Sequence, residues 1–381
     1  MKTLSPKEAL TFAEQAYEIE FDTKTFKPHR RLAKKFSFDV DKTTIQARTG
    51  STLGLVSKRI SNFVLCAKGT GDQNGQFVLA FRGTNFDYTA DILTDLNIGV
   101  KGSSNGSSAH AGFVNTFHSL KGHLSTYIQS NANSIKTIHC VGHSLGGAIA
   151  SLCADWIRVN FKINVVLYTF GAPRVGLQPY AQKSTNSNFA IFRCTNGADP
   201  VPMVPLWPFV HAPIDKPEFR LDSSVGILGD AHKLASSIGY QKTLTSDSWQ
   251  HIGRSSKIHL HRSVRLKFQN SHQVMFNGHW ADKIAAALRT LLKEAGYVGL
   301  IAIQGAFVGS FTFYDLVARS IEKIVRISDR FREQTEGLLG HMLRFAGKVV
   351  HKITDLSFKF IKYVFNLLLK KLNSSVFKAL K

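Results

Sequence analysis

The chain has 381 residues, of which 44% are hydrophobic, so it can form one large domain or two ordinary ones and is too apolar for wholesale disorder. Lysine and arginine number 48 against 26 acids, which gives a formal net charge of +22. Such a charge favours an anionic partner, namely nucleic acid, an acidic protein or an anionic lipid surface.

The N-terminal residues lack the uninterrupted apolar core of a signal peptide and begin instead like a helix. We expect Ser5 as the N-cap, Pro6 as the first helical residue and Glu8 as the partner that closes a capping box. The sequence therefore predicts a protein that resides in the cytoplasm of the producing cell, or that leaves it by a non-classical secretion route.

Between residues 60 and 205, short apolar runs end at glycines, prolines or polar turns. Enrichment in β-branched and aromatic residues predicts strands in FVLCA, QFVLAFRG, SIKTIHCVG, NVVLYTFGAP and NFAIFRC. The segment 146–161 has helical apolar spacing and lies between two of these strands. This order predicts an α/β fold with a mostly parallel central sheet.

The four cysteines lie in or beside these apolar runs, and no two of them form a C-x-x-C pair. Neither a disulfide framework nor a zinc site is supported, so we expect reduced, mostly buried thiols. They are Cys66, Cys140, Cys153 and Cys194. No metal or organic cofactor is implied.

The character of the chain changes after a predicted helix that begins at Ala281 and ends at Gly296. Residues 297–314 carry no charge, and residues 341–381 hold nine Lys or Arg and one acid. We therefore divide the chain into an α/β domain over residues 1–296 and a basic helical C-terminal region over residues 297–381.

The stretch VGHSLGGA, residues 141–148, contains a serine with glycines two positions before and two positions after it. This spacing is typical of a nucleophile elbow, in which a strained turn between a strand and a helix exposes the hydroxyl of Ser144. Small residues are needed there because the two backbones pass very close together. The strand before it and the helix after it favour the elbow over a plain glycine-rich turn.

A nucleophilic serine needs a base, and the base needs an orienting acid. Asp199 is the best acid, because it follows a predicted strand and would lie at the same sheet edge as Ser144. His279 directly precedes the predicted helix after this strand and is the first choice for the base, with His272 second. The other histidines considered, His251, His259 and His261, lie further from a helix.

Several motifs in order over residues 60–295 resemble the class 3 lipase family, which are α/β-hydrolases related to fungal triacylglycerol lipases. They are FRGTN with DILTDL, HAGF, VGHSLGGA, TFGAPRVG, GADPVPMVP and HWADKI. The resemblance implies an α/β-hydrolase fold with Ser144 as nucleophile, Asp199 as acid and His279 as base. It further implies an oxyanion hole built from the backbone amides of Leu145 and Thr84.

The same resemblance implies that Arg82 and His110 support the site structurally, and it places a lid at residues 85–99. The family's tryptophan in this segment is Ile92 here, and its tyrosine after the histidine motif is Ile284. Phe86, Ile92 and Leu96 would cover an acyl groove as a short lid. The sequence gives residues 207–270 no assignment.

In the C-terminal region, apolar residues recur in steps of three and four, which predicts a cationic amphipathic helix. The apolar positions are Val349, Ile353, Leu356, Phe360, Val364 and Leu367, with Lys348, Lys352, Lys359 and Lys362 largely elsewhere. Such a helix either lies on an anionic membrane or docks on its own catalytic domain. The uncharged run 297–314 is of borderline length for a membrane span, and its glycines favour a packed helix or hairpin.

These observations predict a serine hydrolase that cleaves lipid carboxylic esters through an acyl-enzyme. The positive charge favours glycerophospholipids, hence a phospholipase A, and peripheral contact with an anionic membrane. The alternatives are a lipase or esterase for neutral or small esters, and a membrane-binding or pore-forming toxin with a passenger hydrolase domain. Delivery as a secreted effector with a neutralising protein partner is compatible with these readings. Nucleic-acid binding is disfavoured, because the sequence has no nucleic-acid-binding motif.

Overall fold

A central β-sheet organises the protein, whose structure is a computed structural model. Residues 2–19, 26–38, 40, 45–49, 59–83, 99–187, 189–206, 208–214, 218–222, 228–255, 264–297 and 313–380 are described. The sheet has the strand order β1-β3-β4-β7-β8-β10-β12, and β2 also pairs with β3. The bounds are β1 (Phe36–Phe38), β2 (Ile45–Thr49), β3 (Arg59–Gly69), β4 (Gln76–Phe81), β7 (Thr137–His143), β8 (Asn164–Phe170), β10 (Ala190–Thr195) and β12 (Phe219–Arg220).

The strands from β4 to β12 run parallel to one another, whereas β1, β2 and β4 pair with β3 antiparallel. This confirms the mostly parallel sheet. The carboxyl ends of parallel strands meet at one edge, so the loops after β4, β7, β8 and β10 are brought together there. Ser144 follows β7 directly, and Asp199 lies in the loop after β10.

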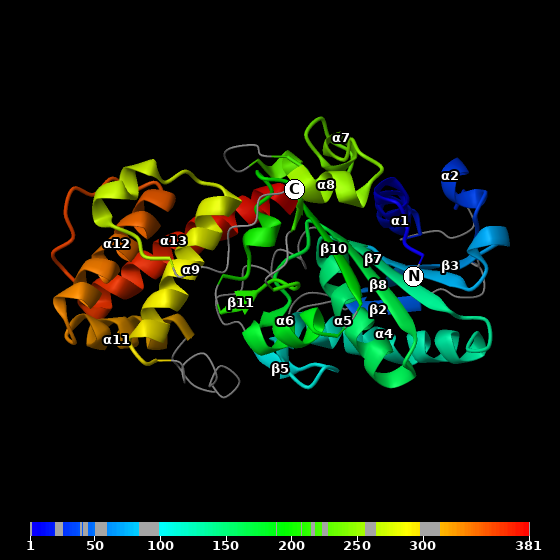
Figure 1. Cartoon of the computed structure of the whole chain (residues 1–381), viewed down its shortest axis with the longest axis horizontal. Coiled ribbons are helices and arrows are strands. Elements are labelled where there is room, and N and C mark those ends of the chain that lie inside the picture. The colour runs from blue at the N-terminus through cyan, green and yellow to red at the C-terminus, as the bar shows by residue number, and fades with distance from the viewer. Residues whose placement is uncertain are drawn as a thin grey trace.

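Helices cover both faces of the sheet (Figure 1). One face packs against α1 (Pro6–Glu18), with Val78, Val141 and Val166 pointing toward it. The other face packs against α4 (Ala111–Ser130) and α5 (Leu145–Phe161), through alternate residues of the same strands. The predicted capping box of α1 is confirmed, because Ser5 and Glu8 exchange side-chain and backbone hydrogen bonds.

The remaining elements are short. A small antiparallel sheet has the order β11-β9-β6-β5. Its strands are β5 (Val100–Gly102), β6 (Ser108–His110), β9 (Gly176–Leu177) and β11 (Phe209–Val210). The short helices are α2 (Arg30–Ala33), α6 (Gln178–Thr185), α7 (Tyr240–Thr243) and α8 (Trp249–Ser255), with 3-10 turns η1 (Gly71–Gln73), η2 (Val201–Met203), η3 (Gly229–Ala231) and η4 (Phe268–Gln273).

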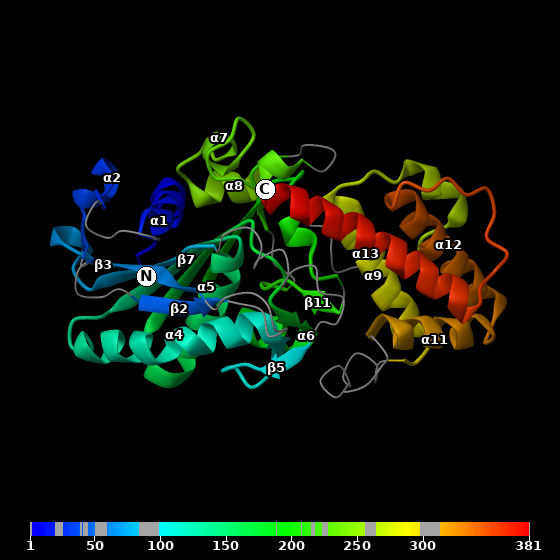
Figure 2. The same ribbon diagram turned by 180° about the vertical axis from the view of Figure 1, so that it is seen from behind.

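Four longer helices form a group beside the sheet (Figures 1 and 2). They are α9 (Gly278–Glu294), α11 (Phe313–Val325), α12 (Asp329–Phe345) and α13 (Phe358–Leu380). Helix α9, which we had placed in the α/β domain, packs against α12. One hydrophobic cluster runs from the α5 face of the sheet into this group, so the two parts share a continuous core. The predicted division after residue 296 therefore passes through the helical group.

The basic C-terminal helix begins later than the sequence indicated. Residues 348–357 are not helical, and Val349 is exposed, so the predicted single face from residue 349 to 367 is wrong. Helix α13 instead buries a face on α11 and α12, of which Ile361, Val364, Phe365, Leu368, Leu372 and Val376 are members. The apolar face of α13 therefore docks on the same chain. The side chains on its other side that remain exposed include Lys359, Lys370, Lys371 and Lys378.

In the part of the chain that the structure describes, no helix combines the length and apolarity needed to cross a bilayer. The uncharged segment lies almost wholly outside this part, since residues 298–312 are not described. The four cysteines are free and buried, and three of them lie in strands of the central sheet.

Candidate active site

Ser144 occupies a strained turn between β7 and α5. Its φ and ψ are 56° and −131°, a conformation that non-glycine residues rarely adopt. A Cβ on Gly142 would clash with the backbone of Gly146, and a Cβ on Gly146 with the backbone of Phe81 and Arg82. The glycines of the motif are therefore needed because strand and helix pass at backbone contact, as the nucleophile elbow predicts.

A chain of hydrogen bonds joins Ser144 to Asp199 through His232. The Nε2 atom of His232 lies 2.9 Å from Ser144 Oγ, and its Nδ1 atom lies 2.9 Å and 3.0 Å from the two oxygens of Asp199. Because the carboxylate can only accept, Nδ1 carries the proton and Nε2 accepts from the serine hydroxyl. This is the arrangement in which an imidazole removes a proton from a nucleophile.

The predicted base, His279, is wrong in this structure, and so is the second choice, His272. His279 lies in the first turn of α9, where its ring packs against that of Trp280 at a centroid distance of 6.0 Å. His272 is exposed in η4 and bonds to the carbonyl of Gln269 at 2.8 Å. The sequence favours His279 as the base because this residue precedes a long helix. The histidine that contacts Ser144 instead follows the short turn η3.

Asp199 is buried and accepts from two further donors. The hydroxyl of Tyr240 donates to Oδ2 at 2.6 Å, and the amide of Val201 donates to Oδ1 at 2.9 Å. Burial and the neighbouring carboxylate raise the pKa of Tyr240, so this hydroxyl keeps its proton and remains a donor. The carboxylate is thus held in one orientation toward His232.

Residues 207–270, which the sequence left without an assignment, supply both His232 and Tyr240. A weak signal was present. The segment HWADKI has isoleucine where the family's motif has tyrosine, whereas Tyr240 follows His232 by eight residues. In the structure Asp282 of HWADKI pairs with the buried Arg174 at 2.7 Å, so this segment anchors α9 to the loop after β8.

A second histidine, His143, bonds to the backbone of the catalytic base His232. It is buried, its Nε2 donates to the carbonyl of His232 at 2.8 Å, and its Nδ1 accepts from the hydroxyl of Tyr17 at 2.7 Å. Burial, followed by the neighbouring His232, holds the pKa of His143 well below its ordinary value. A neutral ring fits these two bonds, with one nitrogen donating and the other accepting.

Leu145, one of the two predicted oxyanion-hole residues, is the first residue of α5. Amides in the first turn of a helix have no acceptor within the helix. The Leu145 amide is therefore suited to donate to an oxyanion near Ser144. Thr84, the other predicted residue, lies outside the described residues, as do Phe86, Ile92 and Leu96 of the predicted lid.

Arg82 and His110, to which the family resemblance assigns supporting roles, both bond to backbone groups. Arg82 is buried, and its guanidinium donates to the carbonyls of Asn62 at 2.6 Å and Gly83 at 2.7 Å. His110 is the N-cap of α4, where its Nδ1 accepts from the amide of Gly112, and its ring stacks on Phe113. Arg82 thus fixes a segment whose backbone lies against Gly146 of the elbow, and His110 fixes the start of α4.

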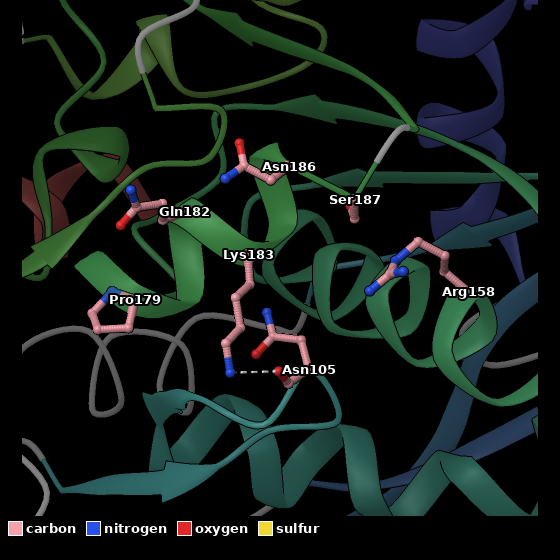
Figure 3. A pocket seen from close by; sticks show the side chains of 7 residues that line it. All are labelled: Asn105, Arg158, Pro179, Gln182, Lys183, Asn186 and Ser187. Carbon is pink, nitrogen blue, oxygen red and sulfur yellow. Dashed lines mark hydrogen bonds between the residues drawn. The ribbon is translucent and has the colours of Figure 1, made fainter.

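A pocket of about 450 Å³ is lined mostly by polar side chains, which Figure 3 shows. Arg158 of α5 and Lys183 of α6 contribute to its lining, and Lys183 bonds to the carbonyl of Asn105. Ser144 and Arg158 stand at opposite ends of α5, and a helical rise of about 1.5 Å per residue separates them by roughly 20 Å. The pocket is therefore not the ester site. Among the described residues, no group of three or more His, Cys, Asp or Glu side chains is placed to hold a metal ion.

The parallel sheet, the elbow and the Ser144–His232–Asp199 chain define an α/β-hydrolase fold with a Ser-His-Asp arrangement. Residues 78–209 match the model of the family described as "Lipase (class 3)", so this part of the chain is similar to that family.

Three curated relatives match at moderate identity. "Secreted mono- and diacylglycerol lipase 1" of Fusarium solani is 33% identical over 40% of this chain and 46% of its own length. "Toxin TseL" of Vibrio cholerae is 26% identical over 59% of this chain and 32% of its own. "Phospholipase A(1) DAD1, chloroplastic" of Arabidopsis thaliana is 30% identical over 34% of this chain and 33% of its own length. The chain thus spans less than half the length of each of these relatives.

Solved lipase structures are also similar. The crystal structure of a lipase from Yarrowia lipolytica is 20% identical, with a TM-score of 0.40, and the match covers 56% of this chain and 80% of that one. The crystal structure of a lipase from Rhizopus microsporus var. chinensis is 21% identical, with a TM-score of 0.38, and the match covers 53% of this chain and 71% of that one.

Proposed function

We propose that this protein is a serine hydrolase that cleaves carboxylic esters of lipids, with glycerophospholipids as substrates. The observation that carries the proposal is the continuous hydrogen-bonded chain from Ser144 Oγ through His232 to Asp199. The match of residues 78–209 to the class 3 lipase family supports a lipid ester as substrate.

The geometry supports the following order of steps. His232 Nε2 takes the proton of Ser144 as its oxygen attacks the ester carbonyl, and Asp199 stabilises the imidazolium that forms. The amide of Leu145 donates to the developing oxyanion. His232 then protonates the leaving alcohol, and an acyl-serine remains. Water attacks this acyl group in turn, gives its proton to His232, and the fatty acid leaves with regeneration of Ser144.

Charge supports a phospholipid over a neutral oil. The chain carries a net charge of +22, and the exposed side of α13 presents Lys359, Lys370, Lys371 and Lys378 to an anionic surface. Two aromatic residues, Tyr363 and Phe377, are exposed among them, as in helices that lie in a membrane interface. One relative is named a phospholipase A(1). We therefore infer phospholipase A activity and peripheral binding to anionic membranes.

The test is hydrolysis of phosphatidylglycerol vesicles and of a triacylglycerol emulsion by the wild type and by Ser144→Ala, with product analysis. We expect fatty acid and lysophospholipid from the vesicles, little product from the emulsion, and none with Ser144→Ala. Preference for the emulsion would replace the phospholipase by a neutral-lipid lipase, for which the relative named a mono- and diacylglycerol lipase is the precedent. Equal activity of wild type and Ser144→Ala would refute the hydrolase itself.

A second proposal is a toxic role after delivery outside the producing cytoplasm, with a neutralising protein partner in the producer. It rests on the similarity to a protein named Toxin TseL. Bacteria that express the wild type with an export signal should lose viability, while Ser144→Ala should be tolerated. Toxicity that persists in Ser144→Ala would instead assign the effect to membrane binding by the C-terminal region.

A further inference from the structure

The C-terminal turn of α13 packs against the turn that carries the catalytic histidine. A Cβ on Gly229 in η3 would lie 2.9 Å from the Cα of Ala379 and 2.9 Å from the carbonyl oxygen of Lys378. Ala379 is buried, as is Val376 one turn earlier. Figure 2 shows α13 running from the helical group to the side of the sheet that carries α8, where it ends. The contact is therefore one of backbone on backbone, with no room for a side chain.

The turn η3 is hydrogen-bonded to the backbone of His232, and the residue before it is hydrogen-bonded to the loop that carries Asp199. The amide of His232 donates to the carbonyl of Gly229 at 3.0 Å. The amide of Leu228 donates to the carbonyl of Ala198 at 3.0 Å, one residue before Asp199. A displacement of Gly229 is thus passed to the base through one hydrogen bond and to the loop of the acid through another.

On its other side, the segment of the base is held by a side chain of β7 and by one from the loop after β10. His143 donates to the carbonyl of His232, and the amide nitrogen of Asn196 donates to the carbonyl of Ala231 at 2.8 Å. These bonds hold the backbone of the segment on the side that faces the sheet. The described element in backbone contact with Gly229 on the outer side is α13.

We propose that the last turn of α13, Lys378 and Ala379, is a positioning element for His232. It closes the outer side of η3 and keeps Nε2 within hydrogen-bond distance of Ser144. This inference rests on the proposed hydrolase function, because it assigns a role in the same site. It does not depend on which ester is cleaved.

The experiment is a double-mutant cycle on otherwise complete chains. The first variant, Gly229→Ala, inserts a methyl group between η3 and α13. The second variant deletes residues 378–381, and the third combines both changes. Gly122→Ala in α4 is the matched control, since a Cβ there meets nothing within 4 Å. The readout is the rate at which a small fluorophosphonate labels Ser144, measured against pH, together with the melting temperature.

We expect Gly229→Ala and the deletion each to lower the labelling rate by about tenfold or more, because small misplacements of a catalytic group are costly. Gly229→Ala should have little further effect in the deleted chain, since its clash partner is gone. The downfield proton resonance of the His232–Asp199 bond should shift in both single variants, and Gly122→Ala should behave as wild type.

Wild-type labelling rates and pH profiles in both single variants, or additive losses in the combined one, would overturn the positioning role even if the melting temperature falls. A wild type that the fluorophosphonate does not label would overturn the hydrolase proposal itself. The two failures are therefore distinguishable.

Discussion

The residue before the nucleophile holds the backbone of the base: His143 Nε2 donates to the carbonyl oxygen of His232 at 2.8 Å. The same ring accepts from Tyr17 of α1 at 2.7 Å. The variable position of the elbow motif is thus occupied by a side chain that links α1, the elbow and the loop of the base.

Substitution of His143 tests this link. The side chain of glutamine can place an amide donor near the position of Nε2, whereas that of asparagine is too short. We expect kcat of lipid hydrolysis to fall roughly 10- to 100-fold in His143→Asn and clearly less in His143→Gln, because loss of the bond lets His232 move. Steady-state kinetics of both variants, with melting temperatures as the control, check it; equal losses would contradict a hydrogen-bond role.

Replacement of the histidines in turn identifies the base. His232→Ala should lower kcat by roughly 10³-fold or more, as expected when a member of a Ser-His-Asp triad is removed. His279→Ala and His272→Ala should retain activity, because neither ring belongs to the Ser144–His232–Asp199 chain. Loss of activity in His279→Ala with a normal melting temperature would restore the assignment made from the sequence.

Gly171, in the loop after β8, borders the triad. Its φ is 58°, and a Cβ there would lie 2.7 Å from Asp199 Oδ2, 2.9 Å from Tyr240 Oη and 3.0 Å from His232 Nδ1. Gly171→Ala should therefore strain the backbone and displace the acid and base, with near-complete loss of activity. Gly102→Ala, where a Cβ meets nothing within 4 Å, is the matched control. Retention of more than half of the activity in Gly171→Ala would show that the loop yields without harm.

Buried histidines make the folded state sensitive to acid. Burial lowers the pKa of His110 and of His139 to about 4, from 6.5. The unfolded chain binds these protons first as the pH falls, so stability is lost between about pH 6.5 and 4, by roughly 2 kcal/mol per histidine at pH 5. Burial also lowers the pKa of His143 and His211, which adds to the loss.

Buried carboxyls oppose this trend. Burial raises the pKa of Asp155 to about 6, so the folded state takes up this proton more readily than the unfolded state and gains stability on acidification. Burial also raises the pKa of Asp282 and of Glu14. The histidines with a lowered pKa outnumber these carboxyls, and we expect a net fall in the free energy of unfolding from pH 7 to pH 5. Urea denaturation at both pH values measures it. A flat profile would argue against neutral buried histidines, and His139→Gln should reduce the slope.

The sequence predicts local features of this site better than those made by distant contacts. Ser144 was found because the elbow needs its glycines within a few residues, and Asp199 because it directly follows a strand of the parallel sheet. His232 follows a three-residue turn in an irregular segment, and its place is decided by Asn196, His143 and α13, which lie far away in the sequence. The start of α13 was missed because apolar spacing continues through residues 349–357, although the chain is not helical there.

The contact between Gly229 and Ala379 gives the site an order of assembly. During synthesis the chain emerges from its N-terminus, so Tyr17, Ser144, Asp199 and His232 are all made long before the turn that closes on η3. Contacts between residues so distant in sequence also form late in folding, because a large loop must be closed first. A nascent or truncated chain would carry every residue of the triad and still lack the contact of α13 with η3 that positions His232. Full reactivity would then mark completion of the whole described fold, from α1 to α13.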